Sequence, residues 1–276
     1  MTTRKQRNNA LGMIAAAVLA LGLAGTARAA LLVATDLNTD GTDVGFEGGW
    51  AGSANVSIQA LPDLTYANYY ITQSGTVDRI YQSNAGPDRQ KVRALESAMS
   101  DEIWFTMLVN VPEIAGRDGY AGITFNNYGN TWDPITTGAR ILLGDSLQVG
   151  FNGGTATVTG SFARDTTHLI LGQMIVGDGN DTLSVWISPD LTSVTSPAGL
   201  PDATYSNTEV EFADSIVSVG VAGRTTTNGG PPVYMDAIWM SNRDTAFYDV
   251  TGIPEPSTVA MVGLFLAAMA IRRRRG

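Results

Sequence analysis

Four oxygen-bearing side chains near the N-terminal end are spaced as in a calcium-binding loop. They are Asp36, Asn38, Asp40 and Glu47. Acidic and amide oxygens at alternate positions, a glycine for the sharp turn (here Gly41) and a final glutamate form the ligand pattern of such loops. The spacing therefore predicts a Ca²⁺ site. A plain polar turn is the alternative, because residues 31–35 suggest a strand rather than an entering helix and Asp43 lies where an apolar residue usually packs.

A second group of polar side chains, Asp178, Asn180 and Asp181, lies between two strand-like stretches. Metal binding is one interpretation of this group. The residues also belong to a Gly-Asp-Gly-Asn turn, and Asn, Asp and Gly tolerate the backbone conformations that hairpin turns require. Turn chemistry therefore explains all three.

Few side chains are available for catalysis. The chain has no cysteine and one histidine, His168, which begins a strand-like stretch. No Gly-x-Ser-x-Gly segment is present to hold a nucleophile beside it. His168 is therefore interpreted as a residue at the rim of a sheet, and we expect a protein that is not an enzyme.

Aromatic side chains are the remaining functional candidates, because several on one surface could stack against sugar rings. They are Trp50, Trp132, Trp186 and Trp239, with Tyr66, Tyr69 and Tyr70. The alternative is that most of them pack in the core, where aromatic side chains contribute much of the stabilisation. The sequence does not identify a glycan-binding residue.

The elements that must position these residues are mainly β-strands. Short apolar or alternating stretches separated by Gly, Asn, Asp and Pro turns indicate an all-β domain. Residues 91–100 could form a helix or lead into a strand. The expected strands cover residues 102–110, 119–126, 139–143, 147–152, 168–176, 181–188, 215–222 and 233–242.

The two ends of the chain have the composition of targeting segments. Residues 1–29 combine basic residues, an apolar run and Ala27-Arg28-Ala29, which is the order of a signal peptide cleaved after Ala29. Residues 253–276 hold Pro254-Glu255-Pro256, an uncharged run over 259–271, and four arginines. The run is shorter than the roughly 20 residues of a typical membrane helix. The arginines would stay on the cytoplasmic side, which places the rest of the chain outside.

Between these ends lies an acidic body, residues 30–252. The end segments hold eight of the 17 basic residues and one of the 26 acidic ones, which leaves the body with a net charge of −16. A surface this acidic disfavours nucleic acid and anionic lipid as partners, because both are polyanions. It suits solubility, cation binding or an environment of neutral polysaccharide.

The C-terminal segment resembles the PEP-CTERM sorting signal of Gram-negative bacteria. The match consists of the Pro-Glu-Pro motif (Pro254, Glu255, Pro256), the apolar run as a transmembrane helix, and the arginine cluster Arg272, Arg273, Arg274 and Arg275. The resemblance implies processing near Pro254-Glu255-Pro256 by exosortase, a membrane protease or transpeptidase. Signal peptidase would cut the other end.

The body resembles the concanavalin A-like, laminin G-type (LamG) jelly rolls. The resemblance lies in the Gly-rich segment 45–52, Trp104-Phe105, the hairpin that ends at residues 185–189, and the closing segment 234–240. It implies an antiparallel two-sheet β-sandwich; an immunoglobulin-like sandwich is the alternative.

Enzymes of the concanavalin A-like fold often carry Glu-x-Asp-x-Glu or Glu-x-Asp-x-x-Glu on one strand. The nearest segment here, Glu209 to Asp214, lacks the central Asp and the final Glu, so no catalytic role is transferred to it.

These observations predict three regions: a signal peptide (1–29), a β-sandwich (30–252) and a sorting signal (253–276). We expect an exported, non-catalytic protein of the cell envelope or extracellular matrix, attached to the membrane by its C-terminal helix before processing. Binding of extracellular polysaccharide is one candidate role. A purely structural matrix component and a secreted polysaccharide-degrading enzyme are the alternatives.

Overall fold

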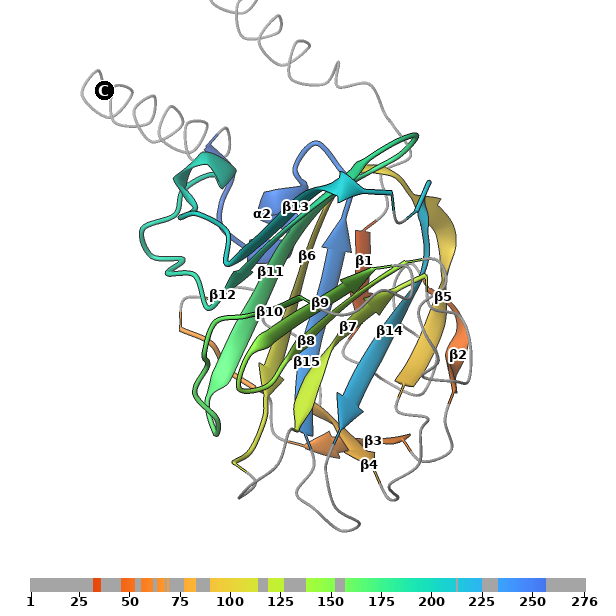
Figure 1. Cartoon of the computed structure of the whole chain (residues 1–276), viewed down its shortest axis with the longest axis vertical. Helices are drawn as coiled ribbons and strands as arrows, with labels where there is room; N and C mark the ends of the chain where they lie inside the picture. Colours follow the sequence, from red (N-terminus) through yellow and green to blue (C-terminus); the bar gives the residue numbers. More distant parts are fainter. Residues whose placement is uncertain are drawn as a thin grey trace, which may run out of the picture. The chain divides into compact units, whose positions relative to one another are not determined.

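The computed structural model describes part of the chain in detail. The described residues are 32–35, 46–52, 56–61, 64–67, 69, 77–82, 90–113, 119–126, 138–151, 157–211, 213–224 and 233–256. For the strand residues before Lys91, and for Glu209, Arg224 and Ala237, the backbone alone is described. These residues form fifteen β-strands, one short 3-10 turn (η1, Pro197–Gly199) and one short helix, so the body is all-β (Figure 1).

The strands form two sheets in which every described pair is antiparallel. The first has the order β13 (Tyr205–Val210), β12 (Asp181–Ile187), β11 (Thr167–Val176), β6 (Asp101–Asn110), β15 (Val233–Ser241), β4 (Val77–Gln82) and β3 (Val56–Leu61), and β1 (Leu32–Thr35) also pairs with β15. The second has the order β10 (Thr157–Thr159), β9 (Leu147–Phe151), β8 (Ala139–Leu143), β7 (Tyr120–Phe125), β14 (Ile216–Arg224), β5 (Gln90–Met99) and β2 (Phe46–Gly52). We call them the first and the second sheet.

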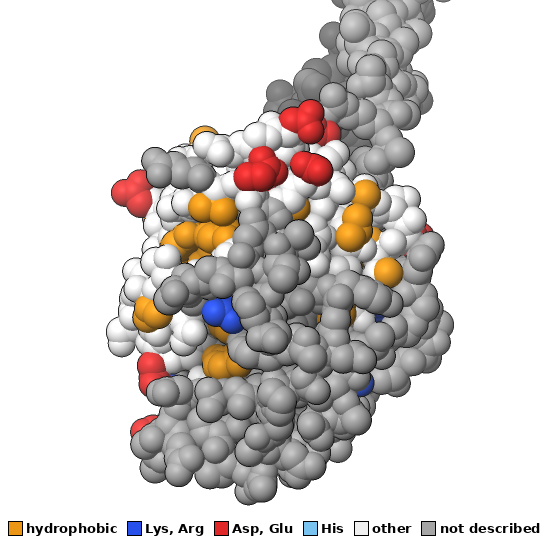
Figure 2. All heavy atoms as spheres, turned by 45° about the vertical axis from the view of Figure 1, so that its right-hand side comes forward, with side chains coloured by type: hydrophobic (Ala, Val, Ile, Leu, Met, Phe, Trp, Pro, Cys, Tyr) orange, Lys and Arg blue, Asp and Glu red, His pale blue; other side chains and the backbone are white. Residues whose placement is uncertain are grey.

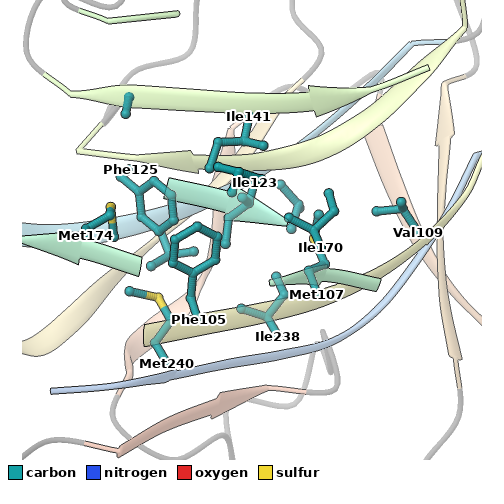
Figure 3. Close-up of a cluster of buried hydrophobic side chains, with 14 of the residues drawn as sticks. Phe105, Met107, Val109, Ile123, Phe125, Ile141, Ile170, Met174, Ile238 and Met240 are labelled. Atoms are coloured by element: carbon teal, nitrogen blue, oxygen red, sulfur yellow. The ribbon is translucent and has the colours of Figure 1, made fainter. Parts of the chain in front are cut away.

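One hydrophobic core joins the inner faces of the two sheets, which makes the fold a β-sandwich. Alternate residues of β6, namely Ile103, Phe105, Met107 and Val109, point into it, as the two-residue period of a strand requires. Phe105 of the first sheet and Phe125 of the second meet edge to face with their ring centroids 5.0 Å apart (Figure 3). Met107 and Ile170 contribute from the first sheet and Ile123 from the second.

A second hydrophobic layer covers the outer face of the first sheet. Trp104, Leu108 and Leu171 point outward from β6 and β11 and are nevertheless buried. The helix α2 (Ala246–Thr251) and the segment 189–204 pack over them. We call this layer the cap. It explains why β6 is apolar on both faces: one face joins the sandwich core and the other joins the cap.

The predicted strands are confirmed, with differences of one or two residues at their ends. The hairpin around residues 177–180 is also confirmed, and Gly179 has a φ of +103°, which only glycine adopts without strain. The helical alternative for residues 91–100 is wrong, because this stretch is strand β5. It lies between β14 and β2, and hydrogen bonds to two neighbouring strands outweigh a weak helical pattern.

Candidate functional site

The described part of the C-terminal segment forms a sharp boundary between the folded body and the Pro-Glu-Pro motif. Helix α2 ends at Thr251, and Gly252 follows in the left-handed conformation, with its N–H donating to the carbonyl oxygen of Tyr248. Among the described residues, Ile253 is the last buried one, with 8% of its surface exposed. Pro254 and Pro256 are exposed and Glu255 is half-buried. The motif thus begins one residue after the hydrophobic packing ends.

Helix α2 is held to the first sheet by apolar packing and by hydrogen bonds. The ring of Phe247 meets the ring of Trp104 edge to face at 5.1 Å. The Thr106 hydroxyl on β6 donates to the carbonyl oxygen of Val250 at 3.1 Å. At the neighbouring residue of the helix, the Ser241 hydroxyl donates to the Asp249 carboxylate at 2.7 Å. These contacts fix the residues directly before Pro254.

Three hydrogen bonds join the segment around Tyr66 and Tyr69 to the rest of the cap. The hydroxyls of Tyr69 and Thr106 lie 2.8 Å apart, and burial raises the pKa of the Tyr69 phenol. The buried carboxylate of Asp236 accepts the N–H of Leu64 at 3.2 Å. The Tyr66 hydroxyl donates to the carbonyl oxygen of Pro189 at 2.9 Å. The segment 64–69 is therefore fastened to β6 and β15 by side chains from distant parts of the sequence.

The candidate sugar-stacking aromatics that the structure describes belong to this cap. Trp186 stacks on Trp104 at 5.7 Å, is 8% exposed, and donates its indole N–H to Pro201. Trp239, Tyr66 and Tyr69 pack against the same cluster. The core alternative thus describes Trp186, whereas the other three are partly buried against the same layer. Only the backbone of Trp50 is described, in β2, while Trp132 and Tyr70 lie outside the described residues.

One acidic turn residue, Asp181, has a structural role in the hairpin. Asp181 is 1% exposed, and its carboxylate accepts the N–H groups of Gly177 at 3.2 Å and Ala213 at 3.0 Å. It therefore ties the β11–β12 turn to the segment between β13 and β14. Across the described residues, no three His, Cys, Asp or Glu side chains are grouped to hold a metal ion. Figure 2 shows several acidic side chains close together along one border of the face in view.

Loss of hydration, together with nearby negative charge, changes the titration of one carboxyl group near this turn. Loss of hydration, and then the charges of Asp181, Asp214 and Asp178, raise the pKa of Glu211. A carboxyl group with a raised folded-state pKa binds protons more readily when the protein is folded. Its contribution therefore favours the folded state at low pH and is lost as the pH rises through its titration range.

Glu211→Gln is expected to raise the melting temperature at pH 7, because it removes one of these repelling charges. The gap from the wild type should close as the pH falls and Glu211 becomes protonated. Thermal melts at about pH 3 to 8 would measure this gap, because a glutamate side chain changes from protonated to ionised within that interval. Glu96→Gln, an exposed glutamate on β5, controls for the loss of one charge from an acidic protein. A gap that is the same at every pH would contradict the prediction.

His168 is held by hydrogen bonds at both ring nitrogens. Nδ1 lies 2.9 Å from the Ser188 hydroxyl and Nε2 lies 2.8 Å from the carbonyl oxygen of Ala163. The ring also meets Phe162 edge to face at 6.0 Å. These contacts fasten the start of β11 to the neighbouring turns, which confirms the interpretation of His168 as a rim residue. Glu209 and Glu211 lie at the end of β13 and just after it.

Several predicted sites lie outside the described residues. These are the signal peptide with Ala29, the loop residues Asp36, Asn38 and Asp40, the apolar run 259–271, and Arg272 to Arg275. Glu47 lies in β2 with its backbone alone described, and β1 confirms the strand before the loop. The calcium site stays a prediction. No helix among the described residues has the length and hydropathy needed to cross a membrane.

Sequence reasoning missed helix α2 and the role of Ile253. A faint signal was present, because Gly252 followed two residues later by Pro254 is typical of the end of a helix. The helix has only six residues, so no apolar period was visible. Its contacts with β6 join residues more than 140 positions apart in the sequence.

Comparison with known proteins places the chain in no family. No protein-family model matches the sequence, and no curated protein matches it significantly. Among solved structures, a protein of unknown function from Shewanella oneidensis MR-1 is 15% identical, with a TM-score of 0.47, covering 87% of this chain and 94% of that one. Carbohydrate-binding module CBM66 from Bacillus subtilis is 11% identical, with a TM-score of 0.33, covering 74% and 94%.

Lectin UEA-II, solved in complex with galactose, is also similar. It is 8% identical, with a TM-score of 0.41, covering 77% of this chain and 99% of the lectin. Similarity at these levels does not establish what this chain binds. The class of fold rests on the two antiparallel sheets and their shared core.

Proposed function

We propose that this chain is an exported, non-catalytic protein of the cell envelope or extracellular matrix, sorted through a C-terminal PEP-CTERM-type signal. In this proposal exosortase cleaves near Pro254-Glu255-Pro256 and signal peptidase cleaves after Ala29. The concanavalin A-like assignment of the sandwich belongs to the same proposal.

The supporting observation is the position of the Pro-Glu-Pro motif. The buried packing of the described residues extends to Ile253, and Pro254 and Pro256 beyond it are exposed. A cut after the motif would leave every described buried residue in the body. The apolar run and arginine cluster beyond it have the order of a membrane stop. A folded body followed directly by a removable membrane tail is the arrangement that sorting by cleavage requires.

Processing at both ends is the expected result for the wild-type protein. Material recovered from the cell exterior should begin at Ala30 and lack Arg272 to Arg275, because both targeting segments act only during export. Intact-mass analysis measures both ends at once. A variant in which serine replaces the four arginines should reach the surface at a lower level, since its tail has lost the charges that keep it cytoplasmic. Exported protein that still carries Gly276 would contradict C-terminal cleavage.

Binding of neutral polysaccharide is the second candidate function. It is favoured by the net charge of −16 on the body, which disfavours polyanionic partners. Trp104 and Trp186 cannot provide the stacking surface, because they are only 2% and 8% exposed. A glycan array with the exported protein tests this candidate, and binding to no glycan would leave the structural matrix role. Release of reducing sugar from polysaccharide would instead support the enzymatic alternative.

A further inference from the structure

We propose that helix α2 is a clasp that must detach from the first sheet before the Pro-Glu-Pro motif can be cleaved. This inference rests on the proposed sorting function. It adds a conformational step to that function, because the folded body itself would decide how often the cleavage site is accessible.

The first step of the argument is the spacing between the clasp and the motif. Val250 and Thr251 are fully buried and Ile253 nearly so, while Pro254 is exposed. Only Gly252 and Ile253 separate the end of the helix from the motif. No exposed linker therefore lies between the body and the residues to be recognised.

The second step concerns how a peptide is bound for cleavage. A peptide in an extended binding site pairs its backbone with the partner over several residues, as an added strand does. A cut within or close after Pro254-Glu255-Pro256 therefore needs Thr251 to Ile253 to be extended and accessible. In the folded body these residues end a helix, and the N–H of Gly252 is bonded to the carbonyl oxygen of Tyr248. The two conformations exclude each other.

The third step is that α2 can detach without loss of the sandwich core. Its packing partners are side chains on the outer face of the first sheet, chiefly Trp104 and Leu108. No residue of α2 belongs to the core between the sheets. Elements of this kind open locally at a lower free energy than the whole domain. The cleavage rate should then follow the fraction of molecules in which α2 is detached.

A disulfide across the clasp provides the test. Ser241 on β15 and Asp249 on α2 are in side-chain contact at 2.7 Å, and the chain has no cysteine of its own. Ser241→Cys with Asp249→Cys places two thiols at this contact in the full-length protein, and a disulfide between them, verified by intact mass before the assay, locks the helix. Ser184→Cys with Ser206→Cys is the matched control, since these residues lie opposite each other on β12 and β13 with hydroxyls 3.3 Å apart.

The full-length proteins are incubated, with and without reductant, with membranes of a bacterium that sorts Pro-Glu-Pro proteins. The oxidised clasp variant should be cleaved at least about tenfold more slowly than its reduced form, because the accessible fraction is nearly abolished. The control pair should be cleaved at the wild-type rate in both states. The wild-type chain with and without reductant corrects for any effect on the processing enzyme.

Loosening the clasp should have the opposite effect on the cleavage rate. Phe247→Ala removes the ring that packs on Trp104 and should be cleaved at least about tenfold faster than the wild type, up to the limit set by the enzyme. Hydrogen exchange of the α2 amides measures detachment directly in each variant. The clasp proposal is overturned if the oxidised and reduced clasp variants are cleaved at the same rate while hydrogen exchange shows that the helix is locked. Absence of cleavage of the wild type would instead remove the proposed sorting function and the clasp with it.

Discussion

Gly172→Ala is expected to destabilise the protein by about 1–3 kcal/mol or more, because this is the usual cost of overpacking a tight core. Gly172 lies on β11 directly opposite Phe105 of β6, with both residues facing the core. A Cβ atom there would lie 1.9 Å from the Phe105 ring, which no real contact permits. The ring cannot move away freely, because it packs edge to face on Phe125 of the opposite sheet.

Urea unfolding of the purified protein measures this loss of stability. Gly177→Ala, in the turn after the same strand, is the matched control because a Cβ there meets nothing within 4 Å. Gly172→Ala combined with Phe105→Leu should lose less than the sum of the two single variants, since the smaller side chain makes room for the methyl group. Equal stability of Gly172→Ala and Gly177→Ala would show that the core tolerates the added atom.

Phe247→Ala is expected to cost about 3–5 kcal/mol, the usual range for truncating a buried aromatic side chain. Phe247 is 3% exposed, and its ring contacts both Trp104 and Tyr248. Its loss would leave a cavity between α2 and the first sheet. Urea unfolding followed by tryptophan fluorescence measures the change, because Trp104 and Trp186 lie next to the cavity.

Asp244→Ala is the control for this variant, since Asp244 is exposed in the connection before α2. Its effect should stay within about 0.5 kcal/mol, as for most surface substitutions. A cost below about 1 kcal/mol for Phe247→Ala would contradict tight packing of the helix, because even a modest cavity exceeds it. Early loss of α2 before global unfolding would agree with the clasp.

The class of the fold could be predicted from the sequence because it depends on local patterns. Leu183 and Val185 alternate with Thr182 and Ser184, and this two-residue period indicates a strand whatever its neighbours are. The turn at 177–180 is also local, since Gly179 alone accounts for the positive φ. Both features could therefore be predicted without reference to distant residues, and the structure confirms them.

The β5 strand could not be predicted in the same way. Val92, Leu95 and Met99 fit one face of a helix as well as they fit a strand. This stretch is a strand rather than a helix because β14 and β2 lie on either side of it and pair with its backbone. An irregularity in each of these pairings disturbs the alternation, so the sequence pattern is blurred as well.

By itself, the sequence determined that the body is all-β and acidic and that the ends have the composition of targeting segments. The tertiary structure decided which faces are buried: the cap covers Trp104 and Trp186, so these rings cannot stack against a sugar. It also decided that Ile253 is buried and that Pro254, the next residue, is exposed. The physical reason is that strand periods are set between adjacent residues, whereas burial of an outer face depends on contacts such as Thr106 with Val250, 144 positions apart.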